Sequence, residues 1–240
     1  NILAIGAHPD DVEFLCAGTL ALYAAEGHKI FIAIATNGNV GSPTLNKSQI
    51  CKIRKNESVD SCQKIGAELI WMNFDDEWLF NDKNTRLVFI DAIRKAEADI
   101  MFIHNTNDYH PDHRNAGQIS EDCRIPVSVR LVESSEIHLK KVPHIFYMDN
   151  IGGISFDPEV YVDVSSVIDI KKDMLACQKS QNDWMLELYD ETPTEIMLKQ
   201  SKFRGLNCGY KHAEGFRQIK TYPQTGSYDL LPKSKKGGNM

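Results

Sequence analysis

Short apolar runs alternate with longer amphipathic segments along the first half of the chain. The apolar runs are rich in Ile, Val and Ala and predict buried strands at Ile2–Gly6, Lys29–Thr36, Glu68–Met72 and Ile100–His104. Between them, apolar residues at helical spacing and closing glycines predict helices at Gly18–Glu26, Lys47–Ile65 and Asn84–Glu97, with another after Pro111. This alternation predicts an α/β fold: a three-layer, mostly parallel, Rossmann-like sheet with helices on both faces.

The pattern is looser after residue 125. We predict strands at His144–Met148 and Val160–Val164, and helices at Ser166–Lys179 and Thr194–Gly205. No linker and no internal repeat interrupts the chain, so we predict a single domain over residues 1–240. The last residues, 230–240, are rich in Lys and Gly and are expected to form a flexible tail.

Composition narrows the class of protein. The chain has 240 residues and a formal net charge of −6, which disfavours binding to nucleic acid or to an anionic membrane. No stretch is long and apolar enough to predict a membrane span, and no basic region precedes the first apolar run, so we expect no signal peptide. Six scattered cysteines without a Cys-x-x-Cys pair indicate reduced thiols, and therefore a cytoplasmic location.

Two clusters of possible metal ligands follow two of the predicted strands. His8-Pro9-Asp10-Asp11-Val12-Glu13 comes after the first strand, and His110-Pro111-Asp112-His113 comes after the fourth. Either cluster alone is as easily a turn or a helix N-cap. Together they lie where open α/β sheets bind ligands, at the carboxyl ends of the strands, and imidazole with carboxylate suits zinc. The sequence therefore predicts a metal site at this edge.

These motifs resemble those of the PIG-L/LmbE-type N-acetylglucosaminyl deacetylase family, bacterial branch, over nearly the whole chain. The resemblance is carried by Ala7–Glu13 together with His110–Arg114. Arg54 and Glu57 look like the family's Arg-x-x-Glu helix, and Arg204-Gly205 with Ala213–Phe216 look like its C-terminal elements. The resemblance implies an LmbE-like fold and a zinc-dependent enzyme that removes an acetyl group from an amino sugar.

The resemblance also implies a role for each residue of the two motifs. His8, Asp11 and His113 would bind Zn²⁺, although Fe²⁺ is compatible with the same ligands. Asp10 would be the general base that takes a proton from the zinc-activated water, and a protonated His110 would stabilise or protonate the reacting carbonyl. Glu13 would brace the first loop, and Asp112 would orient His110 or hold its loop.

Candidate substrate contacts lie on the same predicted edge: Arg54, Asp76, Asn37 and Asp108. One residue departs from the family pattern, because Gln178 stands where many bacterial members have His. Gln can form hydrogen bonds but cannot titrate, which puts the identity of the substrate in doubt.

The leading hypothesis is hydrolysis of an N-acetyl group on a small glucosamine-type sugar by a homo-oligomer. An amidase acting on a larger sugar conjugate would use the same mechanism. A non-catalytic protein that binds sugar or metal is a further alternative, but it would not need the carboxylate of Asp10. A nucleotide-binding domain is disfavoured, because the first loop lacks Gly-x-Gly-x-x-Gly and places carboxylates where phosphates would lie.

Overall fold

The strands of the protein form one seven-stranded sheet in a computed structural model that describes residues 1–222 and 230–233. The strand order is β3-β2-β1-β4-β5-β7-β6. β1 to β5 are parallel, and β7 runs antiparallel to both of its neighbours. The strands are β1 (Ile2–Gly6), β2 (Ile30–Thr36), β3 (Glu68–Phe74), β4 (Ile100–Ile103), β5 (His144–Met148), β6 (Val160–Asp163) and β7 (Ala213–Gln218).

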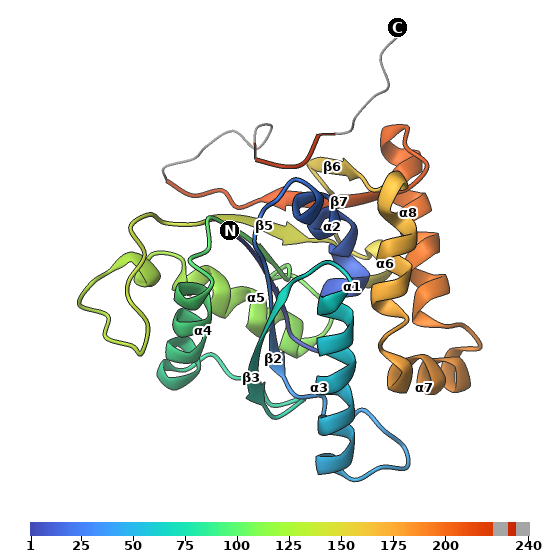
Figure 1. Cartoon of the computed structure of the whole chain (residues 1–240), viewed down its shortest axis with the longest axis horizontal. Coiled ribbons are helices and arrows are strands. Elements are labelled where there is room, and N and C mark those ends of the chain that lie inside the picture. Colours follow the sequence, from blue (N-terminus) through green and yellow to red (C-terminus); the bar gives the residue numbers. More distant parts are fainter. Residues whose placement is uncertain (223–229, 234–240) are drawn as a thin grey trace, which may run out of the picture.

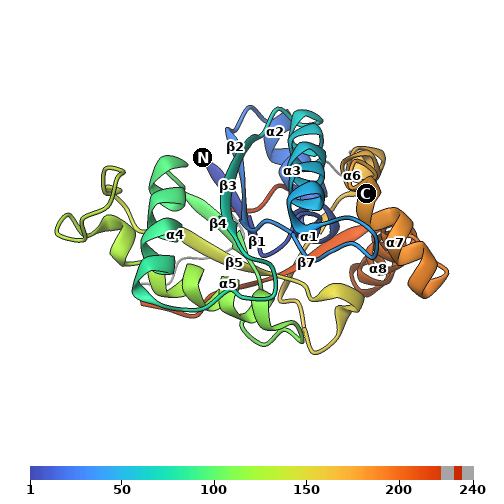
Figure 2. The ribbon, with the colours of Figure 1, turned by 90° about the horizontal axis from the view of Figure 1, so that it is seen from below.

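Helices cover both faces of the sheet, which gives the three layers that Figures 1 and 2 show. One face carries α4 (Lys83–Lys95) and α5 (Pro111–Cys123). The opposite face carries α1 (Asp11–Leu15), α2 (Ala17–Ala25), α3 (Lys47–Gln63) and α6 (Ile168–Leu175), with α7 (Lys179–Tyr189) and α8 (Pro193–Cys208) beside them. Three short 3-10 turns complete the described structure: Pro126–Ser128, Ile151–Gly153 and Ser165–Val167. The predicted fold class is confirmed.

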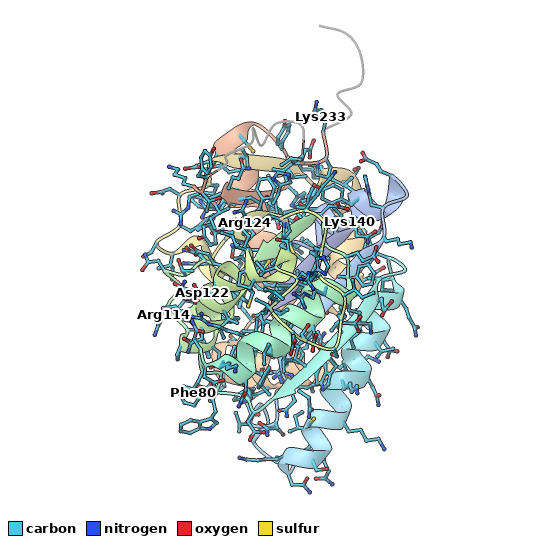
Figure 3. The ribbon with its side chains drawn as sticks, turned by 90° about the vertical axis from the view of Figure 1, so that its left-hand side faces the viewer. Phe80, Arg114, Asp122, Arg124, Lys140 and Lys233 are labelled. Atoms are coloured by element: carbon cyan, nitrogen blue, oxygen red, sulfur yellow. The ribbon has the colours of Figure 1, made fainter. Side chains whose placement is uncertain are left out.

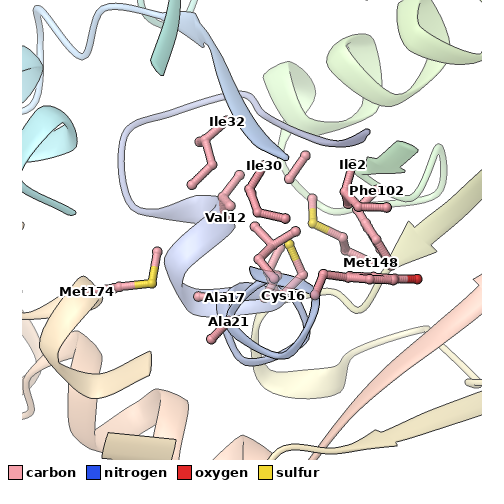
Figure 4. Close-up of a cluster of buried hydrophobic side chains, with 14 of the residues drawn as sticks. Ile2, Val12, Cys16, Ala17, Ala21, Ile30, Ile32, Phe102, Met148 and Met174 are labelled. Carbon is pink, nitrogen blue, oxygen red and sulfur yellow. The ribbon is translucent and has the colours of Figure 1, made fainter. Parts of the chain in front are cut away.

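The alternation of side chains along β1 divides the core in two. Ile2 and Ala4 face the layer of α1, α2 and α6, where they pack with Val12, Phe102 and Met174 (Figure 4). Leu3 and Ile5 face the other layer and pack with side chains of α4 and α5. Since successive residues of a strand point to opposite faces, a fully apolar strand marks the sheet's centre, buried on both sides.

Several elements of the C-terminal region differ from the prediction. β7 was not predicted, because its sequence is largely polar and Glu214, in the middle of it, is buried. Glu214 is satisfied inside the protein by the Lys171 ammonium, the Thr19 hydroxyl and the backbone N–H of Gly18. The helix predicted at Ser166–Lys179 is shorter, and α7 begins as a separate helix at Lys179.

The first described residues of the predicted tail contact the rest of the protein. The Tyr23 hydroxyl donates a hydrogen bond to the Leu230 carbonyl, and Leu230 and Leu231 pack on the core of the α1, α2 and α6 layer. The rest of the predicted tail, residues 234–240, lies outside the described residues. None of the helices within the described residues combines the length and the apolar composition needed to cross a membrane.

Candidate metal centre

The two predicted motifs meet at the centre of the sheet. β1 and β4 are parallel neighbours, so their carboxyl ends lie side by side. The chain leaves β1 into α1 on one face of the sheet and leaves β4 toward α5 on the other. Such a point is where open α/β sheets bind their ligands.

The start of α5 is fixed by its own sequence. Pro111 occupies the first turn, and the His110 Nδ1 atom accepts a hydrogen bond from the backbone N–H of Asp112. One turn after His113, Gly117 lies so close to the end of β4 that a Cβ there would approach the His104 carbonyl oxygen to 2.4 Å. Residues four apart share one face of a helix, so this close packing also directs His113 toward the strand ends.

The donor groups of three side chains from the two motifs form a small triangle. The His8 Nδ1 atom lies 3.2 Å from the His113 Nε2 atom and 3.5 Å from Asp11 Oδ2, and His113 Nε2 lies 3.2 Å from Asp11 Oδ1. Four ligand atoms placed tetrahedrally at about 2.0–2.1 Å from a zinc ion would be about 3.3 Å apart. We call His8, Asp11 and His113 the metal cluster, and its donor set and spacing fit a divalent ion.

Carboxylates behind both imidazoles select the nitrogen that faces the triangle. His8 Nε2 lies 3.1 Å from Asp76 Oδ1 and 3.4 Å from Asp112 Oδ2. His113 Nδ1 lies 3.1 Å from Asp108 Oδ1. A carboxylate that accepts the proton of one ring nitrogen leaves the other nitrogen free to bind a metal. These contacts therefore favour the tautomers that present His8 Nδ1 and His113 Nε2.

Asp11 is held as a carboxylate. Burial alone would raise its pKa, but His113 and His104 lower the pKa of Asp11 well below its usual value. Its Oδ2 atom also accepts a 2.7 Å hydrogen bond from the backbone N–H of His8. An ionised, oriented carboxylate is what a divalent ion requires.

His104 belongs to this site, although the sequence analysis gave it no role. It is fully buried, its Nε2 atom lies 3.0 Å from Asp11 Oδ2, and its ring stacks on His113 with centroids 4.1 Å apart. Asp108, a possible ligand-type neighbour, stands four residues after it. The available signal was its position directly after β4, on the same edge as both motifs.

Asp10 occupies a strained position beside the metal cluster. Its φ of 103° lies in the left-handed region, which non-glycine residues seldom adopt and which is typical of functional sites. Burial raises the pKa of Asp10 to about 7, although the Arg54 guanidinium lowers it in part. One nitrogen of that guanidinium, Nη2, donates to the Pro9 carbonyl at 2.6 Å and to Asp10 Oδ2 at 3.2 Å.

Two glycines make room for Arg54. A Cβ at Gly38 would approach the Arg54 Nη1 atom to 2.5 Å, and a Cβ at Gly41 would approach it to 2.8 Å. Arg54 itself is 3% exposed. Its guanidinium therefore lies behind Asp10 as a positioning group, instead of pointing into open space as the predicted substrate contact would.

His110 faces the metal cluster. Its ring centroid is 4.7 Å from that of His8, and its Nε2 atom lies 3.4 Å from Glu77 Oε1. Burial lowers the pKa of His110 below its usual value, and positive charge on the neighbouring His8 and His113 lowers it further.

The remaining predicted residues are placed as supports. Asp76 and Asp108, expected to contact substrate, are each 4% exposed and contact the metal-cluster imidazoles. The Asn37 Oδ1 atom accepts from the backbone N–H of Asn39. The Asp112 carboxylate accepts hydrogen bonds from the backbone N–H groups of Glu77 and Leu79, which ties the loop after β3 to α5, while its own backbone N–H donates to His110 Nδ1.

Glu13 and Gln178 form a buried pair behind the first motif. Gln178 Nε2 donates to Glu13 Oε1 at 2.8 Å, and Gln178 is completely buried. This links the N-terminus of α7 to α1, the helix that follows the first motif. Gln178 does not line the apolar cavity beside Asp10.

Exposed aromatic residues lie on the loop after β3. Trp78 and Phe80 are 63% and 58% exposed, and their ring centroids are 6.3 Å apart. Phe80 lies at the molecular surface in Figure 3, on the same side as Arg114. Trp78 is thus accessible on the loop that follows β3.

Comparisons with known proteins agree with this geometry. The family model described as PIG-L, GlcNAc-PI de-N-acetylase, matches residues 3–123. A probable N-acetyl-alpha-D-glucosaminyl L-malate deacetylase 2 of Bacillus cereus is 28% identical over 78% of this chain and 86% of that protein. A 4-oxalmesaconate hydratase of Pseudomonas putida is 20% identical over 91% of this chain and 89% of that protein. The N,N'-diacetylchitobiose deacetylase of Pyrococcus horikoshii has the same fold, with a TM-score of 0.80 at 21% identity, over 91% of this chain and 83% of that one.

Proposed function

Because the chain belongs to the PIG-L family of GlcNAc-PI de-N-acetylases, we propose that it is a metal-dependent hydrolase that removes an N-acetyl group from an amino sugar. The observation that carries this proposal is the triangle of His8, Asp11 and His113 donor atoms with the carboxylate of Asp10 beside it. A relative named as a deacetylase of an N-acetylglucosaminyl conjugate supports the substrate class.

The metal cluster would hold the ion through His8 Nδ1, Asp11 and His113 Nε2. A divalent ion bound there would polarise the amide carbonyl and lower the pKa of a water molecule to about 7. Three protein ligands leave room for substrate or water, as catalytic sites require. Zn²⁺ is the proposed metal, with Fe²⁺ as the alternative.

Asp10 is the proposed general base. It is not part of the triangle, and a carboxyl group with a pKa of about 7 both accepts a proton and returns it near neutral pH. Arg54 fixes the Oδ2 atom of Asp10 and the carbonyl of Pro9, so the carboxylate keeps one orientation. The same carboxyl group, once protonated, is placed to donate the proton to the leaving nitrogen.

His110 is proposed to hold the carbonyl oxygen of the amide through a hydrogen bond from its Nε2–H group. Its Nδ1 atom already accepts from the Asp112 N–H, which assigns the proton to Nε2. A neutral donor at this position stabilises developing negative charge on the oxygen without itself requiring protonation.

The direct test is acetate release from a panel of N-acetyl amino sugars, measured with metal-free protein and again after zinc or iron(II) is added back. We expect release that depends on the metal and is lost in Asp10→Asn. Metal bound at one ion per chain with no acyl group released from any N-acyl sugar would overturn the proposal. Homo-oligomeric assembly and a cytoplasmic location stay predictions from the sequence.

A hydratase is the second candidate, because a 4-oxalmesaconate hydratase matches nine-tenths of this chain. Both reactions need an activated water molecule beside a base, so the metal cluster alone does not separate them. Loss of 4-oxalmesaconate, followed by its ultraviolet absorbance, is the discriminating measurement. Turnover of that acid with no acetate release would favour the hydratase.

A further inference from the structure

An apolar cavity opens directly beside Asp10. Its volume is about 290 Å³. It lies where α1, α7 and α8 come together with the loop before α5 and the turn at Ile151–Gly153 (Figure 2). Its described lining residues are Asp10, Phe14, Tyr109, Ile151, Met185, Pro193 and Ile196.

We propose that this cavity takes an apolar substituent of the amide substrate, such as an alkyl or aryl group of about six to ten carbons. The proposal rests on the function proposed above, because it is the nearness of the cavity to Asp10 that assigns it to the substrate. It specifies a substrate class that differs from the malate conjugate in the name of the Bacillus cereus relative.

The size of the cavity supports a substituent of this kind. A cavity of about 150 Å³ lined by apolar side chains is large enough to bind benzene, so about twice that volume accommodates a short alkyl chain or a substituted ring. Pockets with mostly apolar walls and a few polar groups are typical of sites that bind small organic ligands. Here the polar side-chain groups of the described lining are the carboxyl group of Asp10, next to the metal cluster in sequence, and the hydroxyl group of Tyr109.

The charge around the cavity argues against an anionic substituent. Among its described lining residues there is no Lys or Arg, and the one charged group is the carboxyl group of Asp10. Arg54, which contacts Asp10, is 3% exposed and already donates to the Pro9 carbonyl and to Asp10. A malate or phosphate group in the cavity would lie against a carboxylate with no free cation to balance it.

The apolar group has two possible sources on the substrate. It is either the acyl chain that is released, on the carbonyl side of the scissile bond, or the aglycone of the sugar, on the nitrogen side. Both groups would make the same kind of apolar contact with the wall of the cavity. Substrates modified on one side at a time distinguish them.

The first experiment compares four compounds with the metal-loaded enzyme: N-acetylglucosamine, N-hexanoylglucosamine, the hexyl β-glycoside of N-acetylglucosamine, and its malyl glycoside. Each methylene that becomes buried is worth about fourfold in binding. We expect kcat/KM for one of the two hexyl compounds to exceed that of N-acetylglucosamine at least tenfold, and the malyl compound to show no such gain. A preference for the malyl compound would overturn the proposal.

Variants of the wall locate the effect. Met185→Trp fills the cavity and is expected to lower the ratio of kcat/KM for the preferred hexyl compound to that for N-acetylglucosamine at least fivefold. Leu186→Trp is the matched control, because Leu186 is the next residue of α7, is 46% exposed and does not line the cavity. Ile196→Lys adds a cation to the wall and is expected to raise kcat/KM for the malyl compound relative to kcat/KM for the hexyl compound. A hexyl preference that survives both cavity variants would contradict the assignment.

A binding measurement separates the two proposals. Hexyl β-glucoside, which has no amide, is titrated into the metal-loaded protein in a calorimeter. We expect binding to the wild type and to Leu186→Trp, and at least tenfold weaker binding to Met185→Trp, with circular dichroism to show that each variant is folded. If acetate is released but there is neither a hexyl preference nor binding of hexyl β-glucoside, the role proposed for the cavity is overturned and the proposed deacetylase activity is kept. No acyl release from any compound, with hexyl β-glucoside still bound, would overturn the deacetylase and keep the cavity.

Discussion

The metal cluster and the wall of the apolar cavity adjoin at Asp10, but different parts of the chain build them. The cluster comes from loops that follow β1 and β4, within the residues that the family model matches, and its side chains are buried polar groups paired with one another. Most of the wall comes from α7, α8 and the turn at Ile151–Gly153, which lie beyond the matched residues. The described side chains that these elements contribute to the wall are apolar: Ile151, Met185, Pro193 and Ile196.

This difference separates two tasks. A buried polar network must satisfy every donor and acceptor, so each member limits its neighbours and few substitutions are tolerated. An apolar wall tolerates exchange of one hydrophobic side chain for another of similar volume. We therefore expect changes in the cluster to abolish the reaction, and changes in the wall to alter which substrate is used.

The largest effect is expected from His113→Ala. The variant removes one of the three proposed ligands, and we expect metal affinity to fall more than about 100-fold, beyond the loss that is typical when only a supporting partner of a ligand is removed. Metal content after dialysis and acetate release both measure the result. His28→Ala is the control, since His28 is exposed on the loop before β2, at the opposite edge of the sheet. Full metal occupancy in His113→Ala would place the site elsewhere.

Asp10→Asn tests the junction between the two regions. Asn tolerates the left-handed conformation of residue 10, so the fold of the loop should be kept while the proton acceptor is lost. We expect kcat to fall about 10²- to 10⁴-fold with metal content unchanged. Steady-state kinetics and metal analysis of the same sample measure both quantities. A kcat equal to that of the wild type would exclude Asp10 as the base.

Asp108→Ala tests whether this buried carboxylate supports metal binding or contacts the substrate. Asp108 contacts His113 Nδ1, so we expect metal affinity to fall about 10- to 100-fold while KM at saturating metal stays near the wild-type value. Asp75→Ala is the matched control, because Asp75 is exposed on the same edge and its recorded partner is the Asn39 amide. A raised KM with unchanged metal affinity would instead support the substrate contact predicted from the sequence.

The sequence was most informative where one periodicity dominates. β1 and β5 have the predicted bounds, and the two His-Pro-Asp motifs were expected on the same edge because parallel strands end there together. β7 was missed since its buried polar residues are satisfied by partners far away in the chain, such as Lys171 for Glu214. Alternation of apolar and polar residues carries no information about such pairs.

The direction of side chains in the loops could not be predicted in the same way. Asp76 was expected to face the substrate, but the loop turns at Glu77, whose φ is 70° and whose N–H donates to Asp112. This turn brings Asp76 behind His8. His104 was likewise missed, because its contacts with Asp11 and His113 depend on how the ends of β1 and β4 adjoin.

The smallest effect on catalysis is expected from Gln178→Leu. The sequence associated Gln178 with substrate identity, whereas its Nε2–H donates to Glu13 in the core, away from the lining of the cavity. Leu removes that donor and leaves the buried Glu13 carboxyl group without it, which should lower the free energy of unfolding by about 1–3 kcal/mol. Thermal denaturation measures this loss of stability. The ratio of kcat/KM for the hexyl sugar to kcat/KM for the acetyl sugar should change by less than about twofold, which is less than the effect of burying one methylene group. A changed ratio with unchanged stability would show that residue 178 acts on the substrate after all, and would assign part of the selectivity to the start of α7 and not only to the lining of the cavity.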